Sequence, residues 1–234
     1  MMRLDKYLAE MRVGTRQEVK KQIRQGKVTV NGTVVKAADT KIDETCDEVT
    51  IGGRNISYVS YEYYMLNKPA GVVSATEDRR DTTVIDLIKE KKRKDLFPVG
   101  RLDKDTEGLL LITNDGELAH RLLSPKKHVD KVYYAKVQGK VDESDVKAFA
   151  DGVDIGDDTP AKSADLRILK SGEESEIELT ITEGRFHQVK RMFHAVGKEV
   201  IYLKRLSMGS LALDKTLTKG EYRSLTEEEI KKLC

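Results

Sequence analysis

The architecture of this chain is set by one segment, Pro98-Val-Gly-Arg-Leu-Asp-Lys-Asp-Thr-Glu-Gly-Leu-Leu-Leu-Ile-Thr-Asn-Asp-Gly116. Its second half is an apolar run, 109–112, bounded by a glycine and by an Asn-Asp-Gly turn signal. A short apolar run between turn signals predicts a buried strand. The polar residues 101–107 then form a loop at the mouth of this strand. Loops held by rigid strands commonly carry catalytic groups.

Asp103 is the candidate catalytic residue of this loop, because it lies between two cations, Arg101 and Lys104. A neighbouring cation favours the ionised form of a carboxylate, which a nucleophile or a base must be. Local salt bridges in a purely structural turn produce the same pattern. Charge alone therefore does not assign a function to Asp103.

The composition restricts the class of protein. With 234 residues, 38% of them apolar and 35% charged, the chain can bury a core and has room for a small module and a larger domain. No apolar run reaches the length of a membrane span, and the N-terminus lacks a signal-peptide region. The two cysteines, Cys46 and Cys234, are far apart, and the four histidines show no zinc spacing. We expect a cytoplasmic protein with no metal, no cofactor and no membrane partner.

The charge is unevenly distributed. Residues 1–36 hold nine Lys or Arg against three acids, and residues 185–209 hold six against one. Residues 142–183 are acidic, with thirteen acids against four Lys or Arg. Two separate basic blocks favour a polyanionic partner such as nucleic acid, although a solvated surface of mixed charge has the same average composition.

The first 35 residues predict two short helices and a hairpin. Apolar residues recur at helical spacing from Leu4 to Leu8. Thr15 and Glu18 form a capping-box pattern that opens a second helix, 16–25. The alternating segment 27–35 has Asn-Gly at its centre, which is a strong hairpin signal.

This N-terminal pattern resembles the αL RNA-binding module of the ribosomal protein S-four type. The matching residues are Arg3-Leu-Asp5, Thr15-Arg16 and Gly26-Lys-Val-Thr-Val-Asn-Gly32. The resemblance implies an RNA-binding domain over residues 1–58; the alternative is a basic helical hairpin with a solvated face. The expected RNA contacts of this domain are Arg3, Arg16, Lys20, Lys21, Arg24 and Lys27.

The central segment resembles the active-site motif of RNA pseudouridine synthases, through Gly-Arg-Leu-Asp-x-x-Thr-x-Gly-Leu-Leu from residue 100. It is most similar to the RsuA/RluB type, which modifies single sites in ribosomal RNA. Three other segments are similar to motifs of the same family, namely Lys68-Pro-x-Gly, Lys131-x-Tyr and Glu183-Gly-Arg-x-His-Gln-Val-Lys-Arg-Met. The implied fold is α+β, with a catalytic domain over residues 62–234 built on a mixed, mainly antiparallel sheet.

In that domain we expect strands at 109–112, 128–137, 166–169 and 176–182. We expect helices at 84–94, 117–123, 142–151 and 186–196. A closing helix is capped by Thr226. Two roles are open for Lys68: a structural role in its turn, or an RNA contact.

The resemblance implies that uridine in RNA is converted to pseudouridine, with no cofactor. The target uridine must be flipped out of its stack. Asp103 is then the essential residue, either as a nucleophile at the sugar or as the base for its C2′ proton. Tyr133 stacks on the uracil or acts as base at C5, with an aromatic core position as the alternative. Lys190 pairs with Asp103, and Arg191 is the second candidate for this pairing. The expected RNA contacts around the site are Arg101, Arg185, Arg191 and Arg205.

The resemblance also implies a target and partners. The motifs are closest to the small-subunit branch, so we expect a 16S rRNA uridine of the uridine-516 type, acted on by a monomer that binds ribosomal RNA. Two alternatives stay open: a 23S rRNA target, and a ribosome-associated RNA-binding protein that has lost catalysis.

Overall fold

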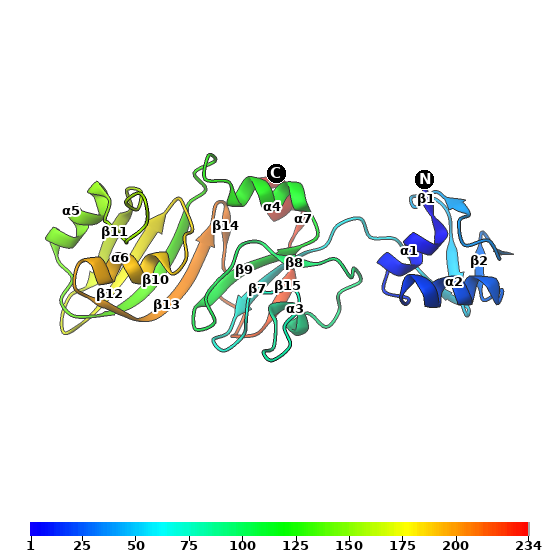
Figure 1. Cartoon of the computed structure of the whole chain (residues 1–234), viewed down its shortest axis with the longest axis horizontal. Coiled ribbons are helices and arrows are strands. Elements are labelled where there is room, and N and C mark those ends of the chain that lie inside the picture. The colour runs from blue at the N-terminus through cyan, green and yellow to red at the C-terminus, as the bar shows by residue number, and fades with distance from the viewer. Residues whose placement is uncertain (234) are drawn as a thin grey trace. The chain divides into compact units, whose positions relative to one another are not determined.

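The structure of the protein is a computed structural model that describes residues 1–233, so the prediction for Cys234 lies outside the described residues. The chain forms two compact units (Figure 1). One unit holds residues 1–62 and 89–96, and the other holds residues 63–88 and the chain from 97 onward. Among residues 1–233, no helix has both the length and the apolar character needed to cross a bilayer.

The first unit packs two helices on small sheets. Leu4, Tyr7 and Leu8 are buried on the first helix, and Val19 and Ile23 on the second, at the predicted helical spacing. The helices are α1 (Leu4–Glu10) and α2 (Arg16–Arg24). The strands are β1 (Met2–Arg3) with β4 (Lys41–Ile42), and the sheet β3 (Thr33–Val34), β2 (Val28–Val30), β5 (Val49–Ile51) and β6 (Arg54–Asn55).

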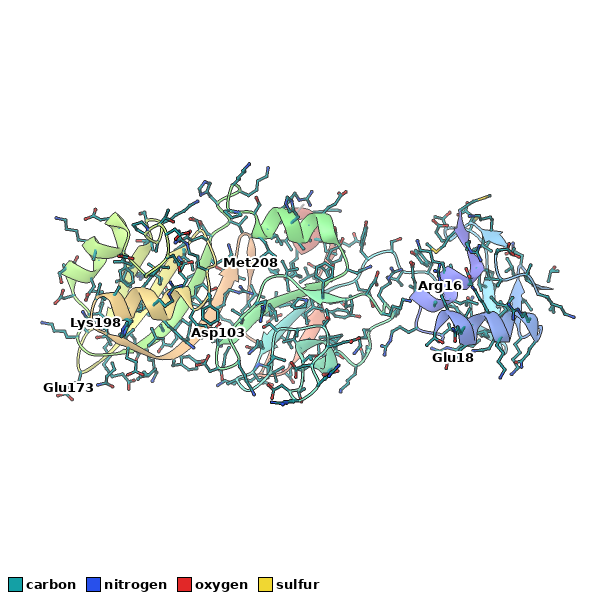
Figure 2. The ribbon with its side chains drawn as sticks, viewed as in Figure 1. Arg16, Glu18, Asp103, Glu173, Lys198 and Met208 are labelled. Carbon is teal, nitrogen blue, oxygen red and sulfur yellow. The ribbon has the colours of Figure 1, made fainter. Side chains whose placement is uncertain are left out.

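Local signals in this unit are confirmed. The Thr15 hydroxyl accepts from the Glu18 backbone N–H, and the Glu18 carboxylate accepts from the Thr15 N–H at 2.7 Å, which completes the predicted capping box. Arg16 and Glu18 mark the first turn of α2 in Figure 2. Asn31 and Gly32 both have positive φ, at 50° and 78°, as a two-residue hairpin turn requires.

The predicted helix over 84–94 is wrong beyond its first turn. The helix α3 spans only Val84–Leu87, and residues 89–96 join the first unit. Arg93 explains this course: it is 4% exposed, forms ion pairs with Glu10 at 3.1 Å and Asp95 at 2.7 Å, and donates to the Tyr58 hydroxyl. These buried contacts outweigh the helical pattern, because a guanidinium removed from water requires fixed partners.

The second unit is built on one nine-stranded sheet in the order β11-β12-β10-β13-β9-β7-β15, with β14 beside β13 and β8 beside β9. The neighbours are antiparallel except β13 and β9, so the sheet is mixed and mainly antiparallel, as predicted. The strands are β7 (Tyr63–Lys68), β8 (Phe97–Pro98), β9 (Glu107–Thr113), β10 (Lys131–Gln138), β11 (Asp165–Lys170), β12 (Glu174–Ile181), β13 (Glu199–Met208), β14 (Leu211–Ala212) and β15 (Tyr222–Ser224).

Helices cover this sheet in two groups (Figure 1). Residues of α4 and α7 share one core cluster with β9, which includes Leu109, Leu111, Leu118 and Leu233. Phe149 of α5 and Phe193 of α6 stack edge to face at 4.9 Å between ring centroids. The helices are α4 (Gly116–Leu123), α5 (Glu143–Asp151), α6 (Gln188–Ala195) and α7 (Glu227–Leu233).

The strand β9 is buried at all seven positions, as its apolar sequence predicts. At its start, the β13 backbone comes so close that a Cβ on Gly108 would lie 2.3 Å from the Arg205 carbonyl oxygen. Gly108 also has a φ of 98°, which favours glycine. Both constraints require glycine where the loop enters the strand.

We expect Gly108→Ala to lower the free energy of unfolding by at least ~2 kcal/mol, because it combines a backbone clash with an unfavourable φ. Thermal and urea unfolding of the full chain measure this change. Gly116→Ala is the matched control, since nothing lies within 4 Å of its Cβ position and its φ is ordinary. Equal stability of the two variants would contradict the close approach of β9 and β13.

Candidate active site

The loop before β9 carries Asp103 into a cavity of the second unit. The Thr106 N–H donates to the Asp103 carbonyl at 3.1 Å and closes a tight turn. The cavity has a volume of about 100 Å³ and is lined by Asp103, Tyr133 and Arg101 among others. It shares part of its wall, including Asp103 and His187, with a wider cleft of about 650 Å³. Asp103 thus lies where a large ligand in the cleft could place one small group beside it.

Lys68 holds this loop from beneath. Its side chain is fully buried at the end of β7, and its ammonium donates to the carbonyls of Asp103 at 3.0 Å and Thr106 at 2.9 Å. It also donates to the carbonyls of Pro69 and Lys104. Burial lowers the pKa of Lys68 to about 8. Of the two roles left open for Lys68, the structure supports a structural role in the turn, because the ammonium is fully buried and therefore closed to RNA.

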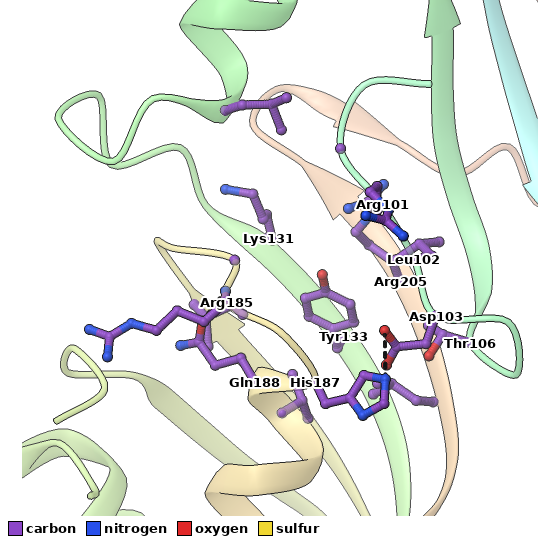
Figure 3. Close-up of a pocket in the computed structure, with 16 residues that line it drawn as sticks. Arg101, Leu102, Asp103, Thr106, Lys131, Tyr133, Arg185, His187, Gln188 and Arg205 are labelled. Atoms are coloured by element: carbon purple, nitrogen blue, oxygen red, sulfur yellow. Dashed lines mark hydrogen bonds and ion pairs between the residues drawn. The ribbon is translucent and has the colours of Figure 1, made fainter. Parts of the chain in front are cut away.

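Tyr133 lies in the cavity wall. The alternation of β10 buries Tyr133, at 7% exposure, on the cavity side and places Tyr134 on the other face. Tyr134 there donates to Glu176 at 2.6 Å, and this hydrogen bond raises the pKa of Tyr134 to about 12. Only Tyr133 of the pair faces Asp103, as the alternation predicts (Figure 3).

Lys190 contacts two carboxylates. From the first turn of α6 its ammonium lies 3.6 Å from Asp103 Oδ2, but only 2.7 Å from both oxygens of Asp105. The hydrogen bond from Lys190 lowers the pKa of Asp105. The predicted pairing with Asp103 therefore exists at the longer distance, and Asp105, which we did not predict in the site, shares the cation.

His187 is a second neighbour of Asp103 that sequence reasoning missed. Its Nε2 lies 3.4 Å from Asp103 Oδ1, drawn as a dashed line in Figure 3. The residue precedes α6 in a left-handed backbone conformation with φ of 47°, and its ring stacks on Phe186, which is 74% exposed. The available signal was the His-Gln pair of the segment, from which we predicted only the role of Lys190.

The arginines predicted to contact RNA here differ in their surroundings. Arg101 is exposed at the cavity. Arg185 points away from Tyr133 in Figure 3 and donates to the Thr159 carbonyl. Arg191 pairs with Asp157 and donates to the Ile155 carbonyl, so it does not contact Asp103. These contacts occupy Arg185 and Arg191 within the protein.

Arg205 was predicted as an RNA contact, yet it is only 2% exposed and lies in the cavity wall. The sheet explains its position, because Arg205 on β13 faces Tyr133 on β10 and donates from Nε to the Leu109 carbonyl at 2.8 Å. Any RNA group that meets Arg205 therefore does so from within the cavity.

The basic residues of the first unit also divide into two sets. Arg3 forms a bidentate pair with Asp5, and Lys20 lies 3.8 Å from the same carboxylate. The exposed residues, which form no ion pair within residues 1–233, are Arg16, Lys21, Arg24 and Lys27.

Comparison with known proteins gives the family of the chain. The RNA pseudouridylate synthase family model matches residues 62–195, and the S4 domain model matches residues 2–49. An uncharacterized RNA pseudouridine synthase of Bacillus subtilis, YtzG, is 51% identical over 98% of this chain and 97% of its own. The ribosomal small subunit pseudouridine synthase A of Haemophilus influenzae is 41% identical over 99% of both chains. A crystal structure of a pseudouridylate synthase is 40% identical over both full chains, with a TM-score of 0.70. The chain therefore belongs to the RNA pseudouridine synthase family, and it carries an S4 RNA-binding domain ahead of its synthase domain.

Proposed function

We propose that this enzyme converts one uridine of 16S rRNA to pseudouridine, at a site of the uridine-516 type. The observation that carries the reaction is the shared cavity, in which Asp103 faces Tyr133 and has Lys190 within 3.6 Å. The relatives named ribosomal small subunit pseudouridine synthase A, similar over nearly the full chain, support the 16S target. A 23S rRNA target is the alternative.

The roles of the residues follow from their chemistry. Asp103 attacks the sugar or removes its C2′ proton, and either act requires an ionised carboxylate. Lys190 lies 3.6 Å from one of its oxygens and His187 lies 3.4 Å from the other, so both oxygens have a neighbour that can orient the carboxylate. Tyr133 stacks on the flipped uracil and is within the same cavity for proton transfer at C5. A protein that only binds RNA does not require Asp103, Tyr133 and Lys190 beside one another.

The two parts of the chain divide the work. We keep the limits 1–58 and 62–234 for the RNA-binding and catalytic domains as a proposal. The exposed cations of α2 are placed to meet successive phosphates, which gives affinity without sequence reading. The protein acts as a monomer in the cytoplasm, since one chain carries both functions and the exposed thiol of Cys46 suits a reducing compartment.

The decisive experiment maps pseudouridine in rRNA from a strain that lacks this gene. We expect one 16S position to lose its modification and to regain it with the wild-type chain but not with Asp103→Asn, which keeps the shape and removes the charge. The variant should bind the RNA within about tenfold of wild type, about 1.4 kcal/mol. A lost 23S position would favour the alternative target, and restoration by Asp103→Asn would contradict catalysis by Asp103.

Lys190 contacts two carboxylates, and paired variants decide which contact matters. We expect Lys190→Met to lower kcat about a hundredfold, because it removes the cation 3.6 Å from Asp103 Oδ2, and breaking such a pair in a site closed by substrate costs about 3 kcal/mol. Asp105→Asn should stay within about fivefold of wild type, since the Asp105 side chain is 72% exposed and such pairs contribute at most about 1 kcal/mol. Equal losses in the two variants would mean that Lys190 acts through Asp105. Lys190→Arg, which keeps the charge, should retain part of the activity.

The lowered pKa of Lys68 predicts that kcat depends on pH in the alkaline range. As pH rises through the lowered pKa of about 8, the ammonium becomes an amine with fewer donors, and the loop carrying Asp103 loses part of its support. We expect kcat to fall above pH 8 in wild type. Lys68→Met should be slower at every pH and should lack this alkaline limb. A wild-type profile that is flat from about pH 7 to 9.5 would contradict the role of Lys68.

A further inference from the structure

Two buried cations form one wall of the catalytic cavity. Arg205 is 2% exposed and Lys131 is 6% exposed, and both line the cavity that holds Asp103. The register of the sheet places Arg205 directly opposite Tyr133, and Lys131 is two residues before Tyr133 on the same face of β10. Figure 3 shows these side chains around one space.

Neither cation has a carboxylate partner within residues 1–233. Arg205 uses Nε for the Leu109 carbonyl, and its Nη2 is buried without any acceptor in this part of the chain. Lys131 donates to the Val129 carbonyl at 2.8 Å. Burial, followed by the charge of Arg205, lowers the pKa of Lys131. Two like charges held together out of water are costly, so the arrangement implies a ligand with negative charge or exposed acceptors.

The size of the cavity decides which part of an RNA reaches these groups. The wider cleft of about 650 Å³ has room for a stretch of RNA backbone, whereas the cavity lined by Arg205 and Lys131 measures about 100 Å³. A single flipped base is the part of the substrate that enters such a space. The buried hydroxyl of Thr106, which also lacks a partner within residues 1–233, lines the same cavity. The wall therefore presents donors to the carbonyl oxygens of a base.

The chemistry explains why these donors are cationic. When the C1′–N1 bond breaks, its electron pair leaves with the uracil, and the negative charge spreads over N1, O2 and O4. After the ring turns, C5 supplies the electron pair of the new bond to C1′. The C5 proton then passes to a base, and N1 takes up a proton. The charge on the uracil is greatest between the two bond changes, and donors that are fixed in advance around it accelerate the reaction.

We propose that Arg205, with Lys131 beside it, is a catalytic residue that binds a carbonyl oxygen of the flipped uracil and stabilises the uracil anion while it is detached. This role rests on the proposed function, because it requires uridine in the cavity. It gives the RNA contact predicted for Arg205 a specific place, at the base inside the cavity. It also separates the two ends of the site: Asp103 acts on the sugar, and Arg205 acts on the base.

The test measures single-turnover rates and RNA affinities of full-length variants, on the rRNA that the wild-type enzyme modifies. Arg205→Met should be about 10²–10³-fold slower, as for the loss of one donor to a developing anion, with RNA affinity within about threefold. Lys131→Met should be slower by about tenfold. Lys204→Met is the matched control on the opposite face of β13 and should keep the wild-type rate within about threefold.

Sulfur substitution in the substrate identifies the contact. Sulfur is a weaker acceptor than oxygen, so RNA with 2-thiouridine or 4-thiouridine at the target weakens one contact at a time. At the oxygen that Arg205 binds, the thio substrate should slow wild type but add little to the loss in Arg205→Met. Additive losses with both substrates would overturn the proposal, as would a wild-type rate in Arg205→Met.

Affinity and folding controls complete the test. A loss of rate in Arg205→Met that is matched by an equal loss of RNA affinity would assign a binding role instead and overturn the proposal. If Arg205→Met fails to fold by thermal melting, Arg205→Lys and Lys131→Met decide in its place: slower rates at unchanged affinity support the role, and wild-type rates overturn it. A wild-type enzyme that modifies no rRNA would refute the proposed function itself.

Discussion

The catalytic loop depends on one buried ammonium. Lys68 donates to the backbone carbonyls of Asp103, Lys104 and Thr106 in this loop. Its own strand β7 pairs with β9, on which the loop ends. Four carbonyl contacts replace the water that the charge loses on burial. The position of Asp103 is thereby set by the backbone rather than by its side-chain partners. Those partners, Lys190 and His187, lie within 3.6 Å of its two carboxylate oxygens.

The sheet brings the rest of the site together from distant parts of the chain. The loop of Asp103 leads into β9, which lies beside β13, and β13 lies beside β10. Gly108 allows the first of these contacts, because any Cβ would meet the Arg205 backbone. Tyr133 on β10 and Arg205 on β13 then lie opposite each other where these two strands pair. Two strands and the loop before a third thus bring Tyr133, Arg205 and Asp103 to one cavity, and α6 places Lys190 beside Asp103.

Several elements of the fold could be predicted from the sequence because they depend on local interactions. The buried strand β9, the Thr15 capping box and the Asn31-Gly32 turn depend on neighbouring residues, so a linear pattern predicts them. The S4 and synthase motifs predicted the family, and Asp103 and Tyr133, both named from the motifs, line one cavity. The separation of Tyr133 from Tyr134 followed from alternation alone.

The remaining features depend on contacts between distant residues. The left-handed conformation of His187 belongs to a non-glycine residue, and no linear pattern predicts it. Lys190 reaches Asp105 only because α6 and the loop are adjacent in the fold. The burial of Arg205 was not predicted, because arginines are usually exposed and its position depends on a neighbouring strand almost a hundred residues earlier. The early end of α3 has the same origin, in the ion pair between Arg93 and Glu10.

The course of residues 89–96 has a consequence for how this protein can be divided. The polypeptide passes between the two units three times, after residues 62, 88 and 96. A single cut near residue 60 therefore does not yield two intact halves. The first would lack Arg93, so Glu10 would lose that ion pair and the Tyr58 hydroxyl would lose that donor. The second would carry Arg93, whose guanidinium is buried in the intact chain, without these partners. Modular exchange of the RNA-binding half, by recombination or by protein engineering, requires two segments of chain to move together.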